Sequence, residues 1–178
     1  RDGLGLIESS SEVESLARSV EDAGGVQFVP ALTGLGAPYW WPEARGVITG
    51  LTRGTTRAHL ARATLEAMAL QNCEILIAME KDLGKKLRGL RVDGGASANN
   101  LLMQMQSDYM GTEVIRPRAI ETTSMGAAYL AGLGVGFWKS LDDVKKVWKM
   151  DQSFKPVMNK KNRSERLREW QAAVKKTR

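Results

Sequence analysis

Apolar residues recur along the chain at two spacings, one typical of helices and one typical of half-buried strands. The segments with helical spacing are bounded by Ser, Thr, Asn or Gly, which commonly begin or end a helix. This pattern predicts helices near residues 11–22, 56–83, 98–110 and 123–133. Short apolar runs and alternating segments predict strands near residues 26–29, 46–51, 87–92 and 112–116.

Local capping signals set the expected ends of two of these helices. A serine run at Ser9–Ser11 can cap the first helix, which we expect to continue to about Asp22 and to end before Gly24–Gly25. A threonine cap at residues 55–56 begins the long helix, and Gly84 ends it. Strands and helices then follow one another in succession, which favours parallel pairing with right-handed crossovers. The sequence therefore predicts one α/β domain.

The most informative motif is the run Val-Asp-Gly-Gly-Ala-Ser-Ala-Asn-Asn from Val92 to Asn100. It lies between a predicted strand and a predicted helix. Two adjacent glycines permit a tight turn and let a ligand approach bare backbone. The first amides of the following helix have no partner within that helix, so they favour an anion or a polar ligand edge. A nucleotide shelf and an ordinary tight turn both fit this local pattern.

Composition and charge narrow the class of protein. With 43% hydrophobic and 26% charged residues, the 178-residue chain has the composition of a globular domain with a real core. No apolar run approaches the roughly 20 residues of a membrane span, so we expect no membrane insertion. Cys73 is the only cysteine and His59 the only histidine. These counts exclude an internal disulfide and zinc sites built from Cys and His. They favour a location in the reducing cytoplasm for the protein.

Basic residues are concentrated at the C-terminal end of the sequence. From Lys139 to Arg178 there are 13 Lys and Arg against 5 Asp and Glu. Such a tail can bind nucleic acid. However, acidic residues interrupt it, and Leu167, Trp170 and Val174 share one face at helical spacing. We therefore expect a solvated C-terminal helix that packs through Trp170, and no nucleic-acid partner.

Three stretches of this chain resemble the C-terminal part of the FGGY carbohydrate kinases, members of the actin and hexokinase superfamily. They are Pro30–Trp40 with Ala44–Gly46, Gly46–Glu66, and Val92–Gly132. The second is similar to the second FGGY signature in spacing and residue type. The loop from Thr33 to Trp40 resembles that of the family's glycerol kinases more than that of its xylulokinase-like members. Trp41 departs from the family, where an aspartate is common.

The resemblance implies the fold and extent of the domain. We expect an α/β, ribonuclease-H-like C-terminal nucleotide-binding domain over residues 1–178, without its N-terminal strands and without the kinase's N-terminal domain. The chain begins at Arg1 with neither an initiator methionine nor a signal-peptide pattern, as a piece of a longer protein would. A sheet that lacks strands leaves an unpaired edge or an uncovered apolar face. We therefore expect a homo-oligomer.

The resemblance also implies a reaction. The full-length protein would transfer the γ-phosphoryl group of ATP to a terminal hydroxyl of glycerol, with Mg²⁺. In the family the phosphate loop, the glycerol-contacting residues and the catalytic aspartate all lie upstream of Arg1. We therefore expect no catalytic residue and no metal ligand in this chain, no activity of the chain alone, and glycerol binding only with the N-terminal domain.

The nucleotide contacts carry over to the Gly-Gly motif. Gly95 matches a family glycine whose backbone lies beside the nucleotide, and Asn99 matches the asparagine on the adenosine side. The resemblance implies that Gly94, Ala96 and Ser97 shape the same shelf for ATP or ADP. Asp93 has two open interpretations: it could orient a magnesium-bound water, or it could brace the turn.

Two other functional hypotheses remain open at this point. The chain could be a free-standing nucleotide-binding or interaction module that uses the kinase scaffold without its chemistry. It could also be a fragment of another FGGY sugar or polyol kinase.

Overall fold

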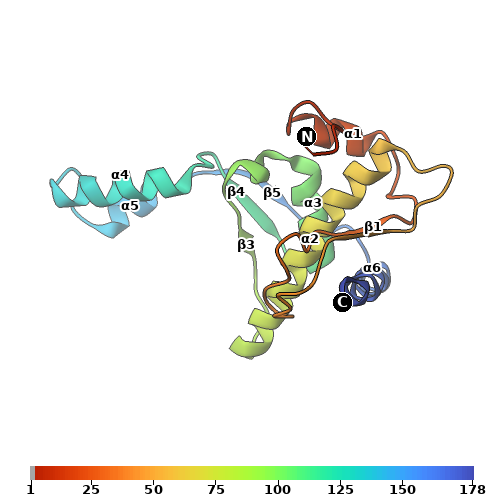
Figure 1. Cartoon of the computed structure of the whole chain (residues 1–178). Coiled ribbons are helices and arrows are strands. Elements are labelled where there is room, and N and C mark those ends of the chain that lie inside the picture. Colours follow the sequence, from red (N-terminus) through yellow and green to blue (C-terminus); the bar gives the residue numbers. More distant parts are fainter. Residues whose placement is uncertain (1–2) are drawn as a thin grey trace.

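The computed structural model describes residues 3–178, in which a long central helix, shorter helices and two small sheets form the body and two helices project from it (Figure 1). The α-helices of this part are α1 (Glu12–Arg18), α2 (Arg57–Leu83), α3 (Asn100–Met110), α4 (Thr122–Gly134), α5 (Leu141–Val147) and α6 (Lys160–Val174). Two 3₁₀ helices, Gly95–Ala98 and Lys175–Thr177, precede α3 and follow α6. The strands are β1 (Gln27–Val29), β2 (Val47–Thr49), β3 (Leu90–Arg91), β4 (Val114–Pro117) and β5 (Met150–Phe154).

The strands form two separate sheets. Strands β1 and β2 pair antiparallel, with Phe28 opposite Ile48. In the other sheet, β4 lies between β3, to which it is parallel, and β5, to which it is antiparallel. The expected parallel pairing is therefore confirmed for β3 and β4. The other pairs, β1 with β2 and β4 with β5, are antiparallel.

Helix α2 runs through the middle of the molecule, and its ends follow the capping signals. Thr56 and His59 form a reciprocal capping box at its start: the Thr56 amide donates to His59 Nδ1 over 3.2 Å. Gly84 ends the helix in the left-handed conformation, with φ of 64°. The predicted long helix, with a threonine cap and a terminal glycine, is confirmed.

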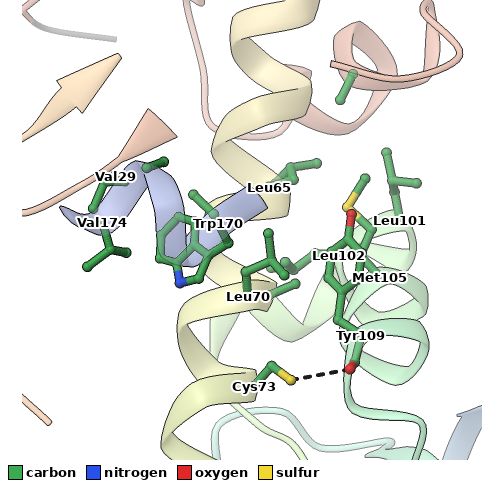
Figure 2. Packing of buried hydrophobic residues seen from close by; sticks show 14 of the residues in the cluster. Val29, Leu65, Leu70, Cys73, Leu101, Leu102, Met105, Tyr109, Trp170 and Val174 are labelled. Atoms are coloured by element: carbon green, nitrogen blue, oxygen red, sulfur yellow. Dashed lines mark hydrogen bonds between the residues drawn. The ribbon is translucent and has the colours of Figure 1, made fainter. Parts of the chain in front are cut away.

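The main core forms where α2 packs between α3 and α6 (Figure 2). Leu65, Leu70 and Cys73 of α2 are buried against side chains from both neighbours. The buried side chains that α3 contributes are Leu101, Leu102, Met103, Met105 and Tyr109. The Cys73 thiol donates to the Tyr109 carbonyl over 3.2 Å, and burial raises its pKa to about 11. It therefore stays protonated at neutral pH.

The C-terminal helix packs as its spacing predicts. In α6, Trp170 is 1% exposed and Val174 is fully buried, while Leu167 is half-buried against the core. The Trp170 indole Nε1 donates to Glu74 Oε2 on α2 over 2.6 Å. The end of the chain also contacts the loop that contains Trp41, because the Arg178 guanidinium lies 3.9 Å from the centre of the Trp41 ring.

Several predicted boundaries are wrong. Helix α1 ends at Arg18 and not near Asp22, because the Ser19 amide and hydroxyl both donate to the Leu16 carbonyl and tighten the last turn. The strand expected over 87–92 shortens to Leu90–Arg91. The helix expected from residue 98 begins at Asn100, after a 3₁₀ turn. The sequence analysis also missed α5 and β5.

Helix α4 stands out because it is apolar yet none of its residues, all described in the structure, is buried. Together with α5 it projects away from the body of the molecule (Figure 1). Leu130, Val135 and Phe137 are 69%, 84% and 76% exposed. Trp138 packs edge-on against Tyr129 and Phe137. Exposed apolar surface of this kind is typical of a region that contacts another chain or another part of the same protein.

No helix in the described part of the chain is both long enough and apolar enough to cross a bilayer.

We predict that the isolated chain self-associates at low micromolar concentration through the exposed apolar residues of the α4–α5 arm. The double variant Leu130→Gln/Phe137→Gln should shift the sedimentation coefficient towards that of a monomer, since it removes apolar area that association would bury. Val157→Gln, an equally exposed position on another segment, is the control. Sedimentation velocity of a wild-type chain that stays monomeric throughout this range would contradict the prediction.

Candidate functional site

The Gly-Gly motif forms a compact turn between β3 and α3, which we call the glycine shelf (Gly94–Asn99). Gly94 has φ of 78°, a conformation that favours glycine. Its amide donates to the Ile120 carbonyl over 2.8 Å. Its carbonyl accepts from both the amide and the hydroxyl of Ser97, over 3.0 and 2.7 Å. The turn is therefore held by its own backbone and by one buried serine.

Asn99 ends the shelf and caps α3. Its backbone is extended, and its Oδ1 accepts from the Leu102 amide over 2.8 Å. This is the usual geometry of an asparagine N-cap. The side-chain oxygen of Asn99 is therefore bonded to the backbone of α3.

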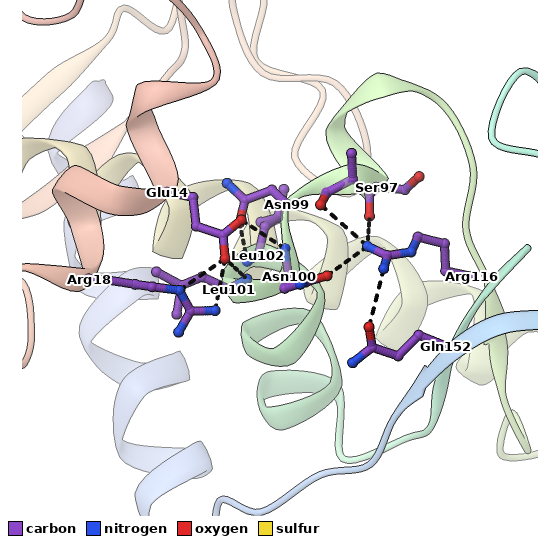
Figure 3. Close-up of polar contacts among 10 residues, drawn as sticks. Glu14, Arg18, Ser97, Asn99, Asn100, Leu101, Leu102, Arg116 and Gln152 are labelled. Atoms are coloured by element: carbon purple, nitrogen blue, oxygen red, sulfur yellow. Dashed lines mark hydrogen bonds and ion pairs between the residues drawn. The ribbon is translucent and has the colours of Figure 1, made fainter. Parts of the chain in front are cut away.

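A carboxylate from α1 occupies two further amides of the first turn of α3. Glu14 Oε2 accepts from the Asn100 amide over 3.0 Å, and Glu14 Oε1 accepts from the Leu101 amide over 3.1 Å (Figure 3). Arg18 donates to the same carboxylate from Nε and Nη2, over 2.9 and 2.8 Å. We expected these amides to favour an anion or a polar ligand edge, and the anion that they bind is a carboxylate of this chain, so these two amides are not open to a ligand.

An arginine from β4 holds the shelf from its other side. Arg116, which is 8% exposed, donates from Nη1 to the Ser97 carbonyl and to Asn100 Oδ1, both over 2.8 Å (Figure 3). Asp151 on β5 forms an ion pair with the same guanidinium at 2.8 Å. Arg116 thus joins the shelf to β4, and its ion pair with Asp151 extends the contact to β5.

A cavity of about 690 Å³ opens beside the shelf, between the shelf, α1 and α2. Its lining is mostly apolar, with a few hydroxyl and amide groups and a single carboxylate, that of Glu14. The lining residues are Ile7, Ser10, Ser11, Val13, Glu14, Thr64, Leu65, Met68, Gly95, Ala96, Ala98, Asn99 and Leu102. No cationic side chain lines it within the described residues. Such a cavity suits a flat, uncharged group with hydrogen-bonding edges, and it disfavours a phosphate.

The shelf residues named from the sequence divide into two groups. Gly95, Ala96 and Asn99 line the cavity. Gly94 and Ser97 do not, and Ser97, at 1% exposed, braces the turn from inside. A side chain at Gly95 would meet no protein atom within 4 Å, so its bare face is open to the cavity.

The sequence analysis missed the residues that face the shelf across the cavity. Glu14 and Val13 come from α1, and Thr64, Leu65 and Met68 come from α2. Each follows the ordinary pattern of an amphipathic helix, so no local signal marks it. The contacts depend on how α1 and α2 pack around α3.

Asp93, which precedes the glycine shelf, connects this part of the chain to α4. Its carboxylate accepts a hydrogen bond from the Thr122 hydroxyl at the start of α4. Among residues 3–178 no three His, Cys, Asp or Glu side chains lie close enough together to hold a metal ion. The described residues therefore do not form a metal-binding cage.

Comparison with known proteins identifies the class. Residues 3–135 match the C-terminal domain of the FGGY family of carbohydrate kinases. This chain belongs to that family. Over 174 residues it is 65% identical to a glycerol kinase of Bdellovibrio bacteriovorus, and over 178 residues it is 57% identical to one of Deinococcus radiodurans.

Solved structures agree with this assignment. The chain is similar to Plasmodium falciparum glycerol kinase with ADP, with a TM-score of 0.87 and 42% identity over 97% of the chain. It also matches a xylulose kinase from Lactobacillus acidophilus, with a TM-score of 0.76 at 20% identity, which supports the fold alone. The expected α/β fold of this kinase superfamily is confirmed.

The matches cover all or nearly all of this chain but a small part of each relative. The chain spans 35% and 36% of the length of the two bacterial kinases and 34% of the Plasmodium chain.

We predict that Asn99→Ala lowers the free energy of unfolding by about 1 kcal/mol, because it removes the N-cap of α3. Asn99→Ser should restore most of the loss, since a serine hydroxyl can accept from the same Leu102 amide. Urea denaturation followed by circular dichroism measures both. Equal stabilities for the alanine variant and the wild-type chain would show that Asn99 does not cap the helix in solution.

Proposed function

We propose that this chain is the C-terminal nucleotide-binding domain of a glycerol kinase, and that the glycine shelf receives the adenosine end of ATP or ADP. The observation that carries the proposal is the largely apolar 690 Å³ cavity beside Gly95, Ala96 and Asn99. Similarity to a glycerol kinase solved with ADP supports the choice of nucleotide. The close matches to bacterial glycerol kinases support glycerol as the acceptor.

The charges around the cavity support one orientation of the nucleotide. The carboxylate of Glu14 lies at the first turn of α3 and already occupies the amides that could have bound a phosphate. An apolar lining favours the base and ribose, while the polyphosphate would point away from this negative charge. Gly95 and Ala96 then lie against the nucleoside, and the Asn99 amide group is placed to donate to its edge.

The chemistry itself requires groups that lie outside the described residues. Phosphoryl transfer needs a group that orients the acceptor hydroxyl and donors around the γ-phosphate, together with Mg²⁺. Asp93 offers one carboxylate and already bonds Thr122. We propose that Mg²⁺ enters with the nucleotide, and that glycerol and the catalytic base belong to the rest of the kinase.

The proposed domain covers residues 1–178 and is incomplete by itself. The relatives are about three times as long as this chain, and α4 exposes apolar residues that need a covering surface. We propose that the N-terminal part of such a kinase supplies that surface, and that the isolated chain covers it with a second copy. The free Cys73 agrees with the expected cytoplasmic location.

A free-standing nucleotide-binding module is the alternative. Such a module would bind a nucleotide at the same shelf and cavity but would take no part in the phosphorylation of glycerol. The two proposals therefore predict different activity once the chain is combined with the upstream part of a kinase.

We predict that the isolated chain does not phosphorylate glycerol, because it contributes no transition-state contacts at the γ-phosphate. Adding the N-terminal part of a related glycerol kinase in trans should restore measurable turnover. A coupled assay for ADP release, in a preparation from a host lacking its own glycerol kinase, measures both. Turnover by the chain alone would contradict the prediction, and failure of complementation would favour the free-standing module.

We predict that Gly95→Ala weakens ADP binding about tenfold, equivalent to roughly 1.4 kcal/mol, while stability stays unchanged. The added methyl group meets no protein atom within 4 Å, so its effect falls on the ligand. Gly126→Ala, in α4, also has open space around its Cβ and is the matched control. Isothermal titration of ADP into both variants is the measurement. Equal affinities would mean that the nucleotide does not lie against Gly95.

A further inference from the structure

We propose that Glu14 and Arg116 are a pair of positioning residues that hold the glycine shelf in its nucleotide-accepting conformation. The proposal rests on the proposed function of the shelf and extends it to two side chains that approach it from opposite sides. Neither side chain is part of the Gly-Gly motif, and Arg116 does not line the cavity.

Glu14 fixes the helix that follows the shelf. Its two carboxylate oxygens take one amide each, those of Asn100 and Leu101. A negative charge at this end of α3 is favourable because the unpaired amides carry partial positive charge. Asn99 takes a third amide of the same turn, so the first turn of α3 is fastened at three points. The position of Asn99 relative to the cavity then depends on α1.

Arg18 holds Glu14 in place. Nε and Nη2 of Arg18 both donate to Glu14 Oε1, over 2.9 and 2.8 Å. The two residues are four apart in the sequence, so they are neighbours on the surface of α1. The Glu14 side chain is 25% exposed, whereas that of Arg18 is 52% exposed. The exposed arginine contributes little by itself. The amide contacts of Glu14 are the part that bears on the shelf.

Arg116 fixes the shelf itself. It donates to the carbonyls of Ser97 and Ala98, over 2.8 and 3.3 Å, and to the side-chain oxygen of Asn100. Asp151 supplies the counter-charge, and Gln152 Oε1 accepts a further bond over 3.2 Å. One planar guanidinium reaches all these acceptors because its donors form a rigid fork, which a lysine lacks.

The two side chains meet at a single residue. The Asn100 amide donates to Glu14, and its side-chain oxygen accepts from Arg116 (Figure 3). Shelf and helix are therefore joined at Asn100 by charged partners from α1 and β4. Losing either partner would leave Asn99 and Gly95 free to shift relative to the cavity wall, which weakens a preorganised contact.

The test uses the 178-residue chain with five single substitutions, two at the positioning residues and three as controls. Glu14→Gln removes the negative charge but keeps the side-chain size, and Arg116→Lys keeps the positive charge but removes the guanidinium fork. We call these two the clamp variants. Glu12→Gln is the control for the first, because within residues 3–178 the Glu12 carboxylate accepts hydrogen bonds from Glu8 and Ser9, near its own helix. Arg118→Lys, at an exposed position two residues further on, is the control for the second.

Two readouts separate positioning from simple stability. Titration of ADP under conditions where every variant is folded should give a dissociation constant about tenfold higher for Glu14→Gln and Arg116→Lys, and unchanged for the two controls. Val174→Ala, which loosens a buried position outside the cavity lining, should lower stability without changing the dissociation constant. Amide hydrogen exchange at Asn100 and Leu101 should accelerate in Glu14→Gln, with no nucleotide present.

The outcomes distinguish this proposal from the function on which it rests. Unchanged ADP affinity in both clamp variants overturns the positioning role. If the wild-type chain binds no ADP, the proposed nucleotide site of the isolated chain fails. Hydrogen exchange then tests by itself whether Glu14 holds the first turn of α3. Faster exchange in Glu14→Gln would then support the role of Glu14 in holding this turn, and unchanged exchange would overturn that role.

Discussion

A buried carboxylate on α2 holds together the parts of this molecule that are far apart in the sequence. Glu74 is 5% exposed, and it accepts hydrogen bonds from the Tyr39 hydroxyl over 2.5 Å and from the Trp170 indole over 2.6 Å. Burying a carboxylate is costly unless its oxygens are satisfied, so the helix tolerates Glu74 only while both donors are in place. The loop that contains Tyr39 and the C-terminal helix α6 are thereby held against α2. Burial, and after it the hydrogen bond to the Glu74 carboxylate, raises the pKa of Tyr39.

The cavity depends on that arrangement. With α6 held on one side of α2, the other side is free to pack against α1 and α3, and this packing brings Thr64 and Met68 opposite the glycine shelf. Gln106, buried in α3, joins the two helices by accepting from Asn72 over 2.9 Å. The shelf therefore lies at the start of a helix that is packed and hydrogen-bonded against α2. Such preorganisation favours ligand binding, because little ordering is left to occur when the ligand arrives.

The division of labour in an FGGY kinase gives this chain a limited chemical task. Several polar side chains near the shelf hold other parts of the chain. Glu14 accepts from amides at the start of α3, and Arg116 donates to carbonyls of the shelf. Asp93 accepts from the Thr122 hydroxyl on α4, and Asp108 accepts from the amides of Val157 and Met158. None of these is arranged as a nucleophile or a general base. In the proposed function, the nucleoside lies against the shelf, and the reacting atoms lie at the boundary with the remainder of the kinase.

The sequence by itself determined the features whose signals lie within a turn or two of the residues concerned. The threonine cap and Gly84 marked the ends of α2, Trp170 and Val174 marked the buried face of α6, and the Gly-Gly motif marked the turn that lines the cavity. Tertiary structure alone decided the rest. Glu14 reaches an amide 86 residues away, β5 adds an antiparallel strand that its polar sequence conceals, and α4 carries apolar residues without burying them. These outcomes depend on which surfaces meet in space, and a local pattern of residues cannot specify a contact between segments that are brought together only when the chain folds.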